Sequence, residues 1–169
     1  STAVYSLILL FSALTQLGLQ YPMLNRSSAE RSQILASVLI IELAVTLAII
    51  PIVVYFFYNV YPVSLQGFSL MGIGILIFLS VGFVAHFVLL GISEAKKVLI
   101  IDTIGTIIKF VTGLILVVTG FGTWGILLSF LIQAIVIGCI TLALAVKIFG
   151  FKLQNMNYLI KIMRDGLVN

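Results

Sequence analysis

The sequence predicts an all-helical integral membrane protein, and two observations predict it: the composition and the lengths of the apolar segments. Hydrophobic residues make up 62% of the chain and charged residues only 8%, whereas about 25% of the residues of a soluble domain are charged. Five long apolar segments follow one another, and each has roughly the 20 residues that a helix needs to cross the hydrocarbon core. Membrane strands are shorter, about 10 residues, and alternate in polarity. We therefore expect a bundle of five transmembrane helices over residues 1–148.

The first two predicted helices cover residues 4–24 and 34–58. The first contains no charged residue and ends before Arg26, and the second begins after Arg31. The second helix also contains Glu42. At a rise of 1.5 Å per residue, this carboxyl group lies about 12 Å from the end of the helix that follows Arg31.

The other three predicted helices cover residues 68–92, 98–118 and 124–146. A short connection with Lys96 and Lys97 separates the first two of them, and an uncharged connection with Gly120 and Gly122 separates the last two.

The basic residues predict the orientation. Eight of the nine lysines and arginines fall at one end of the predicted helices: Arg26, Arg31, Lys96, Lys97, Lys147, Lys152, Lys161 and Arg164. Because basic residues concentrate on the cytoplasmic side, we expect a multi-pass protein of the cell membrane with its N-terminus outside and its C-terminus in the cytoplasm. The net charge of +4 then reflects topology and does not indicate a nucleic-acid partner.

The C-terminal segment, residues 149–169, has apolar residues at helical spacing: Met156, Leu159, Ile160, Met163 and Leu167. This spacing favours a cytoplasmic amphipathic helix on the membrane surface, and a linker into a second half of a longer protein is the alternative. The single cysteine, Cys139, lies within the last predicted helix, so a disulfide framework and a cysteine-based metal site are not expected. We find no catalytic, metal or cofactor motif and do not expect an enzyme.

The predicted helix 98–118 carries the most informative pattern. Its polar and small residues recur every three or four positions, which gathers them on one face: Asp102, Gly105, Thr106, Lys109, Thr112 and Gly113. Lys109 lies about 16 Å into the helix, where a charge costs at least about 2.5 to 3.5 kcal/mol unless it has a partner, water or a charged ligand. The glycines and threonines alone are also typical of simple helix packing.

Other ionisable residues suggest partners for this face. Glu42 has a similar depth to Lys109, and the two side chains can meet if their helices are neighbours, as a functional or a purely structural ion pair. His86 and Asp102 lie nearer the basic end. Together with Glu42 and Lys109 they can line a cavity that opens inward, where Glu42, Asp102 or His86 could couple transport to an ion or a proton. Alternatively, His86 is an interhelical hydrogen-bonding residue, and Asp102 is solvated or pairs with a lysine, Lys96 or Lys97.

Three segments resemble a known family. They are LTQLGLQYPMLNR at residues 14–26, LLGISEAKK at residues 89–97 and VVTGFGTWGILLSFLIQAIVIG at residues 117–138. They are similar to the glycine and leucine patterns of Wzx-type polysaccharide and lipid-linked oligosaccharide flippases, members of the MOP superfamily to which MATE transporters also belong. The resemblance covers essentially the whole chain.

The resemblance implies that the chain supplies the second to sixth helices of the N-terminal lobe, a MOP/MATE-like half, and that a second lobe of the same protein completes it. It also implies alternating access and a lipid-linked anionic sugar as substrate. On this interpretation Lys109 holds the phosphate, Thr106 and Thr112 donate hydrogen bonds to it, and Glu42 adjusts the charge or carries a proton.

Two other classes stay open. A cation-coupled drug antiporter of the MOP type would use Glu42 and Asp102 as its cation site. A membrane scaffold without transport activity would have polar helix faces that are packed and dry.

Overall fold

The computed structural model of the chain describes residues 31–60, 68–90 and 94–150, with residues 152, 160 and 164. The described elements are α3 (Arg31–Val60), α5 (Phe68–Leu90), α6 (Ala95–Leu116), the π-helical turn η2 (Val117–Phe121) and α7 (Gly122–Phe149). None of the described residues forms a strand, so the all-helical prediction is confirmed for them. The predicted helix 4–24 and most of the segment 149–169 lie outside the described residues.

The other predicted helices correspond to α3, α5, α6 and α7, and each end lies within three residues of its predicted position. Three helical stretches of the described chain are long and apolar enough to cross a membrane: Leu35–Tyr55, Leu70–Leu90 and Ala95–Phe149. The third stretch reverses direction at η2 and therefore comprises both α6 and α7.

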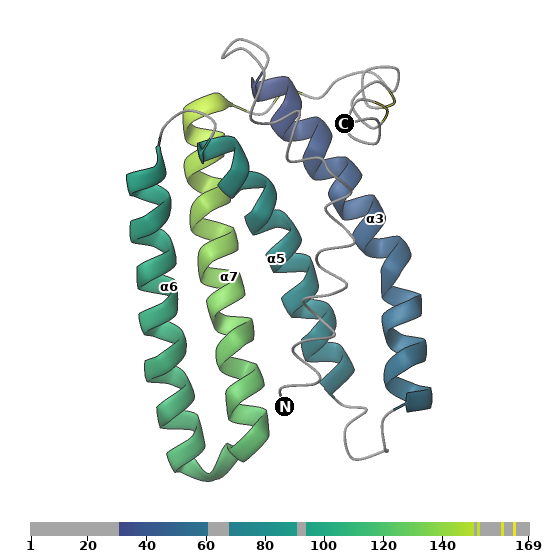
Figure 1. Ribbon diagram of the computed structural model, residues 1–169, viewed down its shortest axis with the longest axis vertical. Coiled ribbons are helices and arrows are strands. Elements are labelled where there is room, and N and C mark those ends of the chain that lie inside the picture. The colour runs from purple at the N-terminus through teal and green to yellow at the C-terminus, as the bar shows by residue number, and fades with distance from the viewer. Residues whose placement is uncertain are drawn as a thin grey trace.

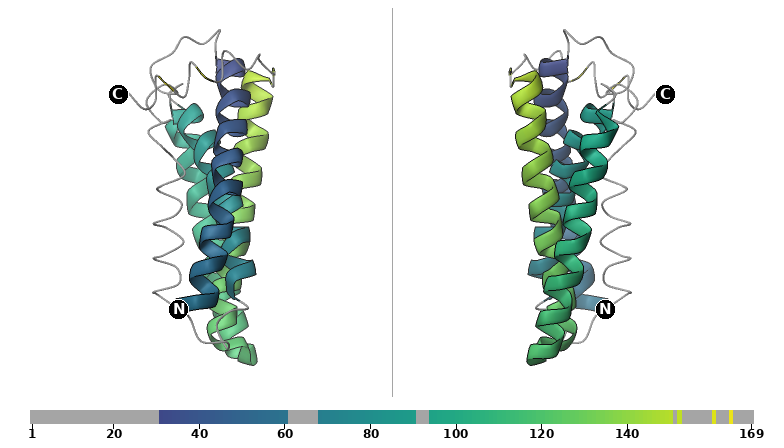
Figure 2. Two further views of the ribbon diagram at one scale, coloured as in Figure 1. Left: turned by 90° about the vertical axis from the view of Figure 1, so that its right-hand side faces the viewer. Right: turned by 90° about the vertical axis from the view of Figure 1, so that its left-hand side faces the viewer.

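The helices stand side by side in the order α6, α7, α5, α3, each antiparallel to the next in the chain (Figure 1). Helix α7 packs chiefly against α5 and α6, and α3 packs chiefly against α5. Seen edge-on, the helices overlap and form a narrow layer (Figure 2). The first residues of α3 and α6 and the last residues of α7 therefore share one end of the layer, and the turn between α6 and α7 lies at the other.

Glycines build the turn between α6 and α7. Gly120 and Gly122 have positive φ angles of 95° and 53°, a region that residues with a Cβ adopt at a cost. Gly125 allows the two arms to approach, because a Cβ placed there would lie 2.8 Å from the Cβ of Leu116. The sequence pattern Gly-x-Gly-x-x-Gly thus forms a helical hairpin.

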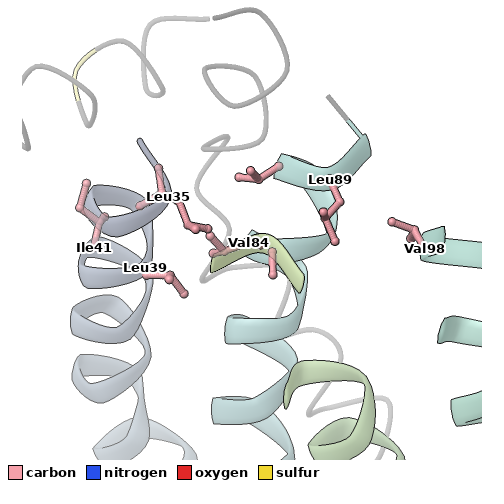
Figure 3. Close-up of a cluster of buried hydrophobic side chains, with 10 residues drawn as sticks. Leu35, Leu39, Ile41, Val84, Leu89 and Val98 are labelled. Carbon is pink, nitrogen blue, oxygen red and sulfur yellow. The ribbon is translucent and has the colours of Figure 1, made fainter. Parts of the chain in front are cut away.

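Two buried apolar clusters hold the layer together. The first lies at the basic end and joins all four helices through residues that include Leu35, Leu89, Val98 and Ala145 (Figure 3). The second lies nearer the turn and joins α3, α5 and α7. Between the clusters the buried hydroxyls of Thr46 and Ser80 form a hydrogen bond of 2.9 Å between α3 and α5. This packing fixes the positions of α5 and α7, against which α6 lies.

Candidate functional site

The polar face of α6 packs on α7. A Cβ added to Gly105 would lie 2.5 Å from Cγ1 of Ile137, and one added to Gly113 would lie 3.1 Å from Oγ of Ser129. The amide nitrogen of Gln133 donates to the hydroxyl of Thr106 over 3.5 Å. Gly105 and Gly113 therefore allow the two helices to pack closely. Simple helix packing is one of the two interpretations of this pattern given by the sequence.

A cavity of about 280 Å³ lies between α5, α6 and α7. Its lining residues are Phe78, Leu79, Gly82, Phe83, His86, Asp102, Thr106, Gln133, Ala134, Ile137 and Gly138. All three helices contribute polar groups to an otherwise apolar wall: an imidazole from α5, a carboxyl and a hydroxyl group from α6 and an amide from α7. A space of this size holds several water molecules, each of which occupies about 30 Å³ in the liquid.

His86 and Asp102 face each other across the α5–α6 boundary. The His86 Nδ1 to Asp102 Oδ2 distance is 3.8 Å, and the two side chains are 25% and 39% exposed. That separation is too long for a hydrogen bond but short enough for electrostatic attraction when the imidazole is protonated, which solvent partly screens at this exposure. Lys97 instead binds Glu94 over 2.8 Å. Asp102 thus faces α5, and among the described residues it forms no ion pair with Lys96 or Lys97, the two lysines that the sequence suggested.

Lys109 lies in a separate groove of about 450 Å³ on the α6–α7 hairpin. The groove is otherwise nearly apolar, with walls from Phe110, Gly113, Leu114, Val117, Ile126, Ser129 and Phe130. The ammonium nitrogen of Lys109 is 5.1 Å from the ring centre of Phe110 and 4.8 Å from that of Phe130. Among the described residues, no carboxylate lies within ion-pair distance of this half-buried lysine.

The two predicted threonines differ in their surroundings. Thr106 lines the cavity with His86 and Asp102, and not the groove of Lys109. Thr112 donates its hydroxyl hydrogen to the backbone carbonyl of Ile108 over 2.7 Å, which leaves only the oxygen lone pairs for another group. The grouping of both threonines around Lys109 is therefore not found.

Glu42 is almost fully buried, with 2% of its surface exposed. It belongs to α3, which is separated from α6 by α5 and α7 (Figure 1). The condition for contact between Glu42 and Lys109, that their helices are neighbours, is not met. The sequence could not decide whether this condition holds, because depth along a helix does not say which helices pack together.

Sequence reasoning also missed residues that shape these sites. Gln133 is one of the few polar residues in its apolar segment of the sequence, but its contact with Thr106 depends on the register of the hairpin. Helices α5 and α7 cross closely at Gly82 and Gly138, because a Cβ added to Gly82 would lie 3.3 Å from Cα of Gly138. In the sequence these two positions are isolated glycines, which indicate such a crossing only weakly. Phe130, beside Lys109, carried no signal because it is one of many large apolar residues in α7.

Comparison of the chain with protein-family models, curated proteins and solved structures finds no match.

Proposed function

We propose that the chain is part of a membrane transporter that moves lipid-linked anionic sugar precursors, as Wzx-type flippases do, with Lys109 as the residue that holds the anionic phosphate. The observation that carries the proposal is the position of a lysine in an apolar groove midway along the α6–α7 hairpin. With 1.5 Å per residue, Lys109 lies about 21 Å from the start of α6 and about 16 Å from Gly120.

The energetics favour an anionic ligand. Two cation–π contacts at roughly 0.5 to 1 kcal/mol each do not offset the cost of about 2.5 to 3.5 kcal/mol for a charge at this depth. A phosphate group supplies the missing negative charge and accepts hydrogen bonds from the ammonium group. The groove therefore has the chemistry of an anion site in an apolar surrounding.

The rim of the groove favours an anion that carries a lipid chain. Phe110 is 69% exposed and Leu114 is 68% exposed, so the groove borders an open apolar surface. A lipid-linked substrate can place its phosphate against Lys109 while its hydrocarbon chain lies along this surface. We further propose that the basic end faces the cytoplasm, that the chain forms a five-helix bundle, and that a second lobe completes the transporter. The two bundles then rock around the site.

The alternatives have less support. An antiporter with Glu42 and Asp102 in one cation site requires side chains of α3 and α6 to meet, and these helices are not neighbours. A scaffold explains the packed glycines Gly105 and Gly113, but it gives no role to a half-buried lysine in an open groove.

The test is transport of a fluorescent polyprenyl-phosphate sugar by the full-length protein in proteoliposomes. Lys109→Gln should reduce the initial rate at least about tenfold, the effect of losing roughly 1.4 kcal/mol of a charged hydrogen bond. Lys109→Arg should keep part of the activity, since arginine supplies the charge with a different geometry.

Lys147→Gln is the matched control, because Lys147 is exposed near the end of α7 and does not line the groove. It should transport as the wild type does. A normal rate for Lys109→Gln, with normal membrane insertion, would show that the lysine does not hold the substrate.

A further inference from the structure

The cavity of His86 and Asp102 has an arrangement that the transport proposal does not use. Helix α6 packs mainly on α7 and makes fewer contacts with α5. Among the described residues, His86 and Asp102 form the oppositely charged pair across this sparse boundary when the imidazole is protonated. They lie at the end of the cavity nearest the connection between the two helices, while Thr106 and Gln133 lie deeper.

The attraction between the two side chains depends on a proton. Histidine is the side chain that gains and loses a proton most readily near neutral pH. When His86 carries the proton, a cation and an anion 3.8 Å apart draw α5 and α6 together. When it does not, an unneutralised carboxylate remains at the edge of an apolar space, and this carboxylate favours hydration.

No other titratable group of the described chain lines the cavity. The remaining residues that α5 contributes are Phe78, Leu79, Gly82 and Phe83, and those that α7 contributes are Gln133, Ala134, Ile137 and Gly138. Near the start of α6, Glu94 and Lys97 are paired with each other. Among the described residues, His86 and Asp102 are therefore the groups that carry charge in the lining of the cavity.

We propose that His86 and Asp102 form a proton-binding site that closes the cavity between α5 and α6 when the proton is bound and opens it when the proton leaves. The proposal is independent of the cargo of the transporter and of the role of Lys109.

The experiment measures entry into the cavity. A cysteine is placed at Thr106 in a Cys139→Ala background, because Cys139 is exposed, and the protein is held in lipid nanodiscs. Methyl methanethiosulfonate is the probe because it is small and uncharged, so the ion pair does not attract or repel it. The labelling rate is measured at about pH 5 and about pH 8, which bracket the usual titration of histidine. At each pH it is divided by the labelling rate of the same cysteine in a variant that also carries His86→Gln. This division removes the intrinsic pH dependence of the thiol.

The normalised rate should be about threefold lower at the acidic pH, the effect expected of a partly exposed ion pair. Asp102→Asn should abolish the difference, and the exchange of the two residues, His86→Asp with Asp102→His, should restore it. The ring nitrogen signals of the single histidine should change over the same pH range as the labelling rate. An unchanged pH response in Asp102→Asn, or no response in the exchanged variant, would overturn the proposal.

Discussion

Lys109 and Glu42 are charged residues at similar depth that have different surroundings. Lys109 is half-buried between two aromatic rings on the α6–α7 hairpin, whereas Glu42 is buried within α3. Because α5 and α7 stand between their helices, the two residues have separate local environments. Changing one of them should therefore leave the other unaffected.

We expect a double-mutant cycle to show this independence. Glu42→Gln and Lys109→Gln should change the free energy of unfolding additively, within about 0.5 kcal/mol, as distant sites do. The measurement is unfolding by SDS titration from mixed micelles, followed by the fluorescence of the single tryptophan, Trp124. A coupling energy well above that value would mean that the two side chains meet, contrary to the observed helix order.

At the scale of the helices, glycines decide how closely the elements approach. Gly138 on α7 faces backbone, because an added Cβ would lie 2.8 Å from the carbonyl oxygen of Phe78 on α5. Gly74 on α5 faces a flexible side chain, with Cδ1 of Leu131 at 3.0 Å from the added Cβ. A backbone atom cannot move without shifting its helix, whereas a leucine changes its rotamer at small cost.

The two glycines make a matched pair of substitutions. Gly138→Ala should lower the free energy of unfolding by about 1 to 3 kcal/mol, the usual cost of overpacking. Gly74→Ala should change it by less than about 1 kcal/mol, since the better helix propensity of alanine offsets the tighter contact. The same SDS titration measures both. Equal destabilisation by the two variants would contradict the close backbone crossing of α5 and α7.

The helix boundaries were predictable, and the helix neighbours were not. The length of each apolar segment set the ends of α3, α5, α6 and α7 to within three residues. A helix that is apolar on all sides has no amphipathic face that indicates its neighbour, so the separation of Glu42 from Lys109 was not visible. Helix α6 is the exception, because its polar stripe indicated a distinct face, and this face lies on α7.

At the scale of the whole molecule, the outer surface matches a bilayer. Large apolar side chains on α6 and its turn are strongly exposed, with Phe110 at 69%, Leu114 at 68% and Val118 at 78%. A soluble monomer rarely exposes so large a contiguous apolar surface, whereas lipid chains cover it without cost. Lys96, Lys97 and Lys147 all lie at the opposite end from the α6–α7 turn.

This distribution predicts the orientation in the cell membrane. In the Cys139→Ala background, a cysteine at Thr119 near the turn should react with an impermeant thiol reagent added to intact cells, and a cysteine at Glu94 should not. Both should react after permeabilisation, which serves as the control. Labelling at residue 94 alone in intact cells would reverse the proposed topology.

The α6–α7 hairpin also has a consequence for the order of folding. Its partners, such as Gly113 with Ser129 and Gly105 with Ile137, lie at equal distances from the glycine turn on the two arms. Closing so short a loop costs little chain entropy, and contacts between residues near in sequence form early. We therefore expect this hairpin to assemble as a unit soon after synthesis, and α5 to find on α7 a surface that is already in place.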